Sequence, residues 1–146
     1  MNRTIRAATL AMLVLAAGAS SARAGVGLHT GLMVDPDDFL VGVHFKSHPI
    51  AENMVLVPSA EAGFGDVTML AGNLDLHYDF QTASTLAPFM GGGITLNWFD
   101  FDAGSSTDFG GSLLGGIQLN QKLFLEAKIG LGDVPDWKFM VGWHRP

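Results

Sequence analysis

The sequence predicts an all-β protein, an eight-stranded antiparallel up-and-down barrel, and three observations support this fold class. Apolar residues recur at every second position in run after run, which is the spacing of β-strands and not of helices. Eight such runs fill the chain after residue 24 and leave no room for a helix of any length. An even number of antiparallel strands can close on itself and so remove its unpaired edges.

Residues 1–24 have the features of a cleaved secretory signal peptide. Arg3 and Arg6 precede the apolar run 7–17, and Ala22-Arg23-Ala24 matches the small-x-small pattern of a cleavage site. The barrel domain is therefore expected to span 25–146. It retains five of the eight basic residues and all fourteen acidic residues, which gives it a net charge of −9. A nucleic-acid partner is not expected, because phosphate binding requires clustered Lys and Arg.

The first four runs each place an apolar face opposite a small or polar one. The run 28–34 has Leu32 and Val34 on its apolar face, and 39–46 is aromatic at both ends of that face. The run 56–64 is looser. The run 70–80 is the clearest, because its polar residues Asp75, His77 and Asp79 all fall on one side. These four runs are predicted to be strands with one face in an apolar environment.

The last four runs continue the alternation to the end of the chain. In 89–98 and 109–119 the face opposite the large apolar residues is rich in glycine. In 123–131 that face carries Glu126 and Lys128, and in 137–144 it carries Lys138. Turn-forming residues separate the runs, with connections expected at 35–38, 65–67, 101–106 and 132–136 at one end, and at 47–52, 81–85 and 120–121 at the other.

Two kinds of barrel fit this pattern: a soluble one with an apolar interior, such as a lipocalin, and a transmembrane one with an apolar exterior. The polar face is rich in Gly, Ser, Asn and Thr and has few long charged side chains, which suits a narrow, filled interior. On the apolar face, aromatic residues gather near both ends of the strands, as they do at the two interfaces of a membrane. They are Phe39, Phe64, Trp98, Phe109 and Trp137 at one level and Phe45, Tyr78, Phe80 and Trp143 at the other. The sequence therefore favours a transmembrane barrel.

Several short stretches resemble those of small bacterial outer-membrane proteins with an eight-stranded barrel domain. They are AGFGD at 62–66, NLD at 73–75, GGG at 91–93, LGDVPD at 131–136 and VGW at 141–143. The resemblance spans nearly all of 25–146 and implies location in the bacterial outer membrane, a structural or surface-interaction role, and insertion by the barrel-assembly machinery. Outer-membrane lipids and lipopolysaccharide are then the expected partners, and a monomer is the expected state. The alternative function is a soluble or membrane barrel that acts as a ligand- or metal-binding module.

No enzyme activity, catalytic residue or cofactor is predicted. Cysteine is absent from the sequence, which excludes thiol catalysis and cysteine-based metal sites. Lipid-acyl hydrolysis would require a nucleophile and a base on the lipid-facing surface. That surface offers only the hydroxyls of Thr30 and Tyr78 and no histidine.

Charged side chains on the inward face have two interpretations. They are Glu61, Asp75, Asp79, Glu126, Lys128 and Lys138. Paired carboxylates can serve as general acid and base, but opposite charges enclosed in a barrel commonly satisfy one another. A structural ion-pair network is the preferred interpretation, with Glu126 beside Lys128 and Glu61 as a further partner. Such a lumen is just wide enough for side chains, so an open pore is not expected.

Acidic residues crowd the connections at one end, which suggests a rim that binds Ca²⁺ or Mg²⁺. They are Asp35, Asp37, Asp38, Asp66, Asp100, Asp102, Asp108, Asp133 and Asp136. Ordinary turn chemistry explains the same residues.

A histidine cluster is expected at the opposite end. If Val34 pairs with Phe39, His29 lies directly across from His44, and closure of the barrel brings His144 near both. Imidazoles suit Zn²⁺, Cu²⁺ and Ni²⁺, so His29, His44 and His144 are the candidate metal ligands. The competing interpretation is hydrogen bonding to neighbouring interior groups.

Overall fold

The computed structural model describes residues 25–35, 37–65, 67–101 and 104–145. The predicted signal peptide, 1–24, lies outside the described residues. The strands are β1 (Gly25–Val34), β2 (Asp38–Lys46), β3 (Pro49–Ala51), β4 (Met54–Gly65), β5 (Thr68–Asp79), β6 (Ala87–Phe101), β7 (Gly104–Gln118), β8 (Leu123–Gly132) and β9 (Trp137–His144). No helix of the described residues is long and apolar enough to cross a membrane.

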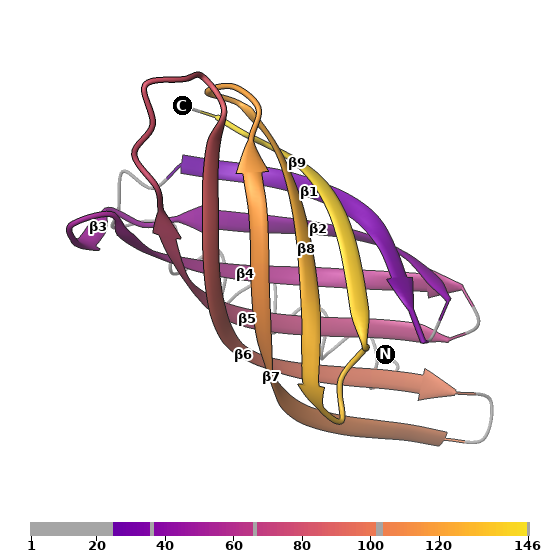
Figure 1. Ribbon diagram of the computed structural model, residues 1–146. Helices are drawn as coiled ribbons and strands as arrows, with labels where there is room; N and C mark the ends of the chain where they lie inside the picture. Colours follow the sequence, from indigo (N-terminus) through magenta and orange to yellow (C-terminus); the bar gives the residue numbers. More distant parts are fainter. Residues whose placement is uncertain (1–24, 36, 66, 102–103, 146) are drawn as a thin grey trace.

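Eight of these strands form a closed antiparallel barrel. Each pairs with its neighbours along the chain, and the barrel closes where β9 lies antiparallel to β1, as Figure 1 shows. The short β3 pairs only with β4 and is an added hairpin within the connection expected at 47–52. The predicted eight-stranded antiparallel barrel is confirmed. Strand edges are thereby paired on both sides around the circumference.

The two ends of the barrel differ in which hairpins they carry. The terminal end is the one at which β1 begins and β9 ends. The distal end is the opposite one, where β1 turns into β2, β4 into β5, β6 into β7 and β8 into β9. The hairpin of β6 and β7 is the longest, with 15 residues in each strand, so pairing continues into the connection expected at 101–106.

The register of the first hairpin differs from the expected one by two residues. Leu32, not Val34, pairs with Phe39, and His29 pairs with Gly42. The turn lies one residue earlier than predicted, and Asp35 in it has a φ of 55°, a left-handed conformation that Asp tolerates better than most residues. A shift of two leaves every side chain on its predicted face.

The alternation places large apolar side chains outside and polar ones inside. Leu32 and Val41 are 60% and 40% exposed, whereas Glu61 and Lys138 are almost fully enclosed. Of the aromatic residues predicted to face outward, Phe39, Phe64, Phe109 and Trp137 are exposed near the distal end, and Tyr78, Phe80 and Trp143 near the terminal end. The barrel therefore has the reverse of the polarity of a water-soluble one.

Apolar side chains fill the interior near both ends. Near the distal end a cluster forms from Met33, Leu40, Met69, Ala71, Phe99 and Met140. Near the terminal end a smaller cluster contains Phe89, Leu114 and Phe124. The buried residues Glu61, Asp75, Glu126, Lys128 and Lys138 lie between them, so the interior is a packed core and not a uniform channel.

Candidate functional site

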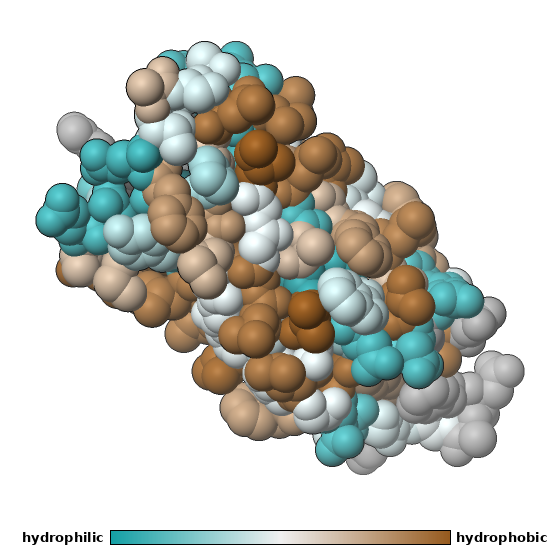
Figure 2. All heavy atoms as spheres, in the orientation of Figure 1, coloured by the Kyte–Doolittle hydropathy of each residue, from teal (hydrophilic) through white to brown (hydrophobic). Residues whose placement is uncertain are grey.

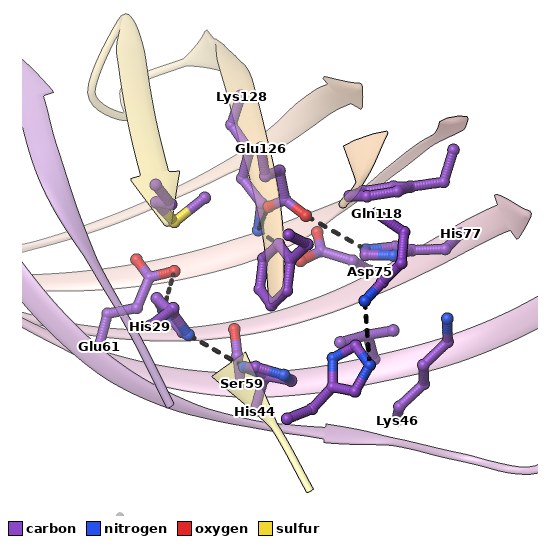
Figure 3. Close-up of a pocket in the computed structure, with 15 residues that line it drawn as sticks. His29, His44, Lys46, Ser59, Glu61, Asp75, His77, Gln118, Glu126 and Lys128 are labelled. Carbon is purple, nitrogen blue, oxygen red and sulfur yellow. Dashed lines mark hydrogen bonds and ion pairs between the residues drawn. The ribbon is translucent and has the colours of Figure 1, made fainter. Parts of the chain in front are cut away.

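A narrow pocket with a cavity volume of about 40 Å³ enters the interior of the barrel from the terminal end. Every one of the eight barrel strands contributes at least one side chain to it. Four of the five histidines in the chain line it: His29, His44, His77 and His144. In Figure 3, His29 lies between His44 and Glu61, and His77 is directed toward Glu126. We call this cavity the terminal pocket.

The floor of the terminal pocket is a layer of buried ion pairs. Lys138 Nζ donates to Glu61 Oε2 at 2.6 Å, and Lys128 Nζ donates to Asp75 Oδ2. Lys128 also lies 3.8 Å from Glu126 Oε1. The predicted ion-pair network is present, but the main partner of Lys128 is Asp75 on β5, across the interior, and not Glu126 on its own strand.

The strand register explains why this layer needs its carboxylates. Lys128 on β8 and Lys138 on β9 are direct cross-strand partners with inward side chains. Like charges placed directly opposite each other destabilise a sheet. Glu61 on β4 and Asp75 on β5 approach from the other wall, and each neutralises one lysine. The layer therefore ties two pairs of strands together across the barrel.

The charges of the layer do not balance. Glu61, Asp75 and Glu126 face two lysines, so one carboxylate exceeds the number of ammonium groups. Glu126 has the longest contacts of the three, 3.8 Å to Lys128 Nζ and 3.9 Å to His77 Nε2. A buried carboxylate without a close cationic partner takes up a proton rather than keep its charge, so Glu126 is the group of this layer that can hold or release a proton.

The candidate metal ligands His29 and His44 lie together, although they are diagonal and not direct partners in the sheet. Their Nδ1 atoms are 3.2 Å apart, and both side chains are buried. On its other side, His29 Nε2 faces Glu61 Oε1 at 3.4 Å. Register alone did not bring the rings together. Gly42 opposite His29 and Gly27 opposite His44 leave room for them.

The third candidate, His144, lies at the rim of the same group. Its ring centroid is 6.2 Å from that of His44, and its Nε2 is 3.3 Å from the side-chain nitrogen of Gln118. The ring stacks on Phe124 at 5.9 Å, and Phe124 meets His44 edge-on. In the described part of the chain, no three His, Asp or Glu side chains converge as a ready-made metal site.

Other polar groups of the interior satisfy one another. Asn73 donates to Ser59 Oγ at 3.0 Å and accepts from Thr95 Oγ1 at 2.5 Å. Nearer the open end, Lys46 Nζ donates to Asp79 Oδ2 at 2.7 Å, with both side chains about one-third exposed. Asn73 is the direct cross-strand partner of both Ser59 and Thr95, so neighbouring hairpins bring these three together, whereas Lys46 on β2 and Asp79 on β5 meet across the intervening β4.

The predicted acidic rim is divided between several environments. Asp35, Asp37, Asp133 and Asp136 are exposed at the distal end, whereas Asp100 and Asp108 lie within strands β6 and β7. Asp66 and Asp102 lie outside the described residues. Asp38 differs from the expectation: it is 2% exposed and turned inward, and neither carboxylate oxygen has a hydrogen-bond partner. Its first position in β2 makes it an inward residue, which the two-residue register shift does not change.

The hydroxyl groups of Thr30 and Tyr78, which were considered for lipid hydrolysis, lie outside the terminal pocket. Thr30 Oγ1 donates to the backbone oxygen of Leu40 at 2.8 Å, so it is occupied within the sheet. Tyr78 packs edge-on against Phe80 near the terminal end.

Solved structures share this fold. The barrel is similar to the N-terminal β-barrel domain of Pseudomonas aeruginosa OprF, with a TM-score of 0.62 and 16% identity over 83% of this chain and 97% of that one. It is also similar to Neisserial surface protein A (NspA), with a TM-score of 0.58 and 14% identity over 83% and 94% of the two chains. The resemblance to eight-stranded outer-membrane barrels that the sequence suggested is thus confirmed at the level of the fold. No protein-family model and no curated protein matches the chain.

Proposed function

We propose that this protein is a small non-enzymatic β-barrel of the bacterial outer membrane with a structural or surface-interaction role. The observation that carries the proposal is the reversed polarity of the barrel. Among the residues that the structure describes, twenty-five large apolar side chains are exposed, while Glu61, Asp75, Glu126, Lys128 and Lys138 are buried. A water-soluble barrel with this surface would expose far more contiguous apolar area than soluble monomers do.

The distribution of the exposed apolar residues supports a lipid-facing belt. Figure 2 shows apolar side chains over much of the side of the barrel, with hydrophilic ones gathered toward its ends. Tyr78, Phe80 and Trp143 lie toward the terminal end and Phe39, Phe64, Phe109 and Trp137 toward the distal end, the arrangement of interfacial girdles. The likeness in fold to the OprF barrel domain and to NspA points to the same setting.

The proposal includes an orientation and partners. The terminal end faces the periplasm and the distal end faces outward, where its exposed acidic residues meet lipopolysaccharide through divalent cations. Insertion depends on the barrel-assembly machinery, and the inserted barrel is a monomer. In the part of the chain that the structure describes, an apolar cluster fills the interior near the distal end, which does not support an open solute pore.

Cell fractionation combined with gel mobility tests the proposal. We expect the protein in the detergent-extracted outer-membrane fraction, migrating as a compact species without boiling and as an extended one after boiling. Recovery in the soluble periplasmic fraction would contradict the membrane assignment. An unchanged mobility on boiling would contradict a stable closed barrel.

A second candidate function is a binding module for a ligand or a metal ion. The terminal pocket favours it, because four imidazoles and an excess carboxylate line one cavity that opens at the terminal end. This candidate is compatible with the first, since the pocket lies inside the barrel and the lipid-facing belt lies outside.

A further inference from the structure

We propose that the terminal pocket binds one transition-metal ion of the Zn²⁺, Ni²⁺ and Cu²⁺ class through the Nδ1 atoms of His29 and His44. The inference rests on the second candidate function and names its ligand. It requires the barrel fold but does not depend on where in the cell the barrel resides.

The separation of the two nitrogen atoms fits a shared ion. His29 Nδ1 and His44 Nδ1 are 3.2 Å apart. Two imidazole nitrogens bound to one tetrahedral zinc ion at about 2.0–2.1 Å lie about 3.3–3.4 Å from each other. A metal ion therefore needs only a small outward movement of either ring. A hydrogen bond between one protonated and one free Nδ1 explains the same distance without a metal, and titration with metal ions separates the two explanations.

Glu61 lies beside the Nε2 atom of His29. His29 Nε2 and Glu61 Oε1 are 3.4 Å apart, an ion-pair distance without a hydrogen bond, and the other oxygen of that carboxylate accepts from Lys138. A carboxylate on one imidazole nitrogen fixes the tautomer and leaves the other nitrogen free to bind a metal. Glu61 is thus a positioning residue, and Lys138 anchors it.

His144 is the candidate for a third nitrogen ligand. It is the last residue of β9 and only partly buried, and its ring must leave its stack on Phe124 and its contact with Gln118 to turn toward the His29–His44 pair. The centroid distance of 6.2 Å to His44 leaves a short path. Water from the open mouth of the pocket completes the coordination, as in metal sites that keep an open position.

The donor type selects the class of ion. The groups that face the pair are imidazole nitrogens, while the carboxylates Glu61 and Asp75 below them are each occupied by a lysine. Imidazole nitrogen prefers borderline transition metals, whereas Ca²⁺ and Mg²⁺ prefer oxygen. We therefore expect the site to bind Zn²⁺ and Ni²⁺ and not to bind Ca²⁺.

Calorimetric titration of the full folded chain in detergent with Zn²⁺, Ni²⁺ and Ca²⁺ tests the inference. We expect one equivalent of Zn²⁺ or Ni²⁺ to bind and no Ca²⁺ heat from this site. His29→Ala and His44→Ala should each weaken binding at least about tenfold, the loss typical even of groups one step removed from a metal. His48→Ala is the matched control: it removes the one histidine outside the pocket and should leave affinity unchanged.

Folding and binding are scored separately. Heat-modifiable mobility of every variant reports the closed barrel, and a rise in unfolding temperature with Zn²⁺ reports binding to the folded state. A heat-modifiable wild type that binds no Zn²⁺ would overturn the inference and leave the barrel intact. Equal binding by wild type and by the His29→Ala, His44→Ala double variant would overturn it as well. An unchanged affinity in His144→Ala would contradict the third ligand.

Discussion

Two lysine–carboxylate pairs with nearly equal N···O distances show how burial changes the contribution of an ion pair to the stability of this barrel. Lys138 and Glu61 are 2.6 Å apart with side chains 6% and 1% exposed. Lys46 and Asp79 are 2.7 Å apart with side chains 31% and 34% exposed. The buried pair has lost its water, so neither member can be removed without leaving an isolated charge.

Replacing Lys138 with Met should therefore destabilise the barrel strongly. Loss of one partner from a buried pair costs about 3–5 kcal/mol. Lys46→Met makes the same change in the exposed pair and should cost about 0–1 kcal/mol. Urea unfolding of the refolded variants in detergent measures both. A Glu61→Gln, Lys138→Met double variant should recover much of the loss, and equal effects of the two single substitutions would contradict the buried-pair account.

At this scale the sequence predicted the face of each residue but not its partner. Period-two alternation placed Glu61, Asp75, Lys128 and Lys138 inside, and all four are there. The pair of Lys128 with Asp75 joins residues 53 positions apart, and that of Lys138 with Glu61 joins residues 77 apart. Such pairings depend on the tilt and stagger of the closed barrel, which no local pattern encodes.

For individual strands, the sequence predicted which residues face outward but not how neighbouring strands pair. The outward face was predictable because the apolar residues fall on alternate positions, and a one-residue error would move all of them to the other face. The register of β1 on β2 was predicted two residues away from the observed one, because the left-handed Asp35 moved the turn. The short β3 was missed, since a three-residue strand in a connection has no period to detect.

Inward glycines make room for the aromatic side chains of neighbouring strands. Gly142 on β9 pairs with Phe124 on β8, and a methyl group at Gly142 would strike the Phe124 ring. On β5, Gly72 faces outward with open space where a methyl group would go. The two positions differ in what they face and not in backbone conformation, since neither has a positive φ.

Alanine at these two glycines should have opposite effects on stability. Gly142→Ala overpacks the interior and should cost about 1–3 kcal/mol. Gly72→Ala meets no neighbour and should be neutral or stabilise by up to about 1 kcal/mol through the unfolded chain. Unfolding free energies from urea titration give both values. Similar changes at the two sites would show that Gly142 does not make room for Phe124.

At the scale of the whole molecule, predicting the kind of barrel depended mainly on which face of the alternating strands lies outside. Aromatic residues near both ends of the apolar face, and small residues on the other, predicted an apolar exterior, and the closed barrel has one. The acidic rim was predicted less well, because turn position decides whether an Asp is exposed, as Asp35 is, or enclosed, as Asp38 is. Composition cannot distinguish the two.

Spin-label accessibility is the most direct test of the lipid-facing belt. The chain has no cysteine, so a single Ile94→Cys or Glu52→Cys substitution gives a unique attachment site. Ile94 is an exposed apolar residue in the middle of β6, and Glu52 is exposed in the β3–β4 turn at the terminal end. In vesicles, the accessibility of the spin label is measured to oxygen, which concentrates in lipid, and to a water-soluble nickel chelate. We expect the label at Ile94 to be accessible to oxygen and not to nickel, and the label at Glu52 to be accessible to nickel. Equal nickel accessibility at the two positions would contradict a lipid-facing belt.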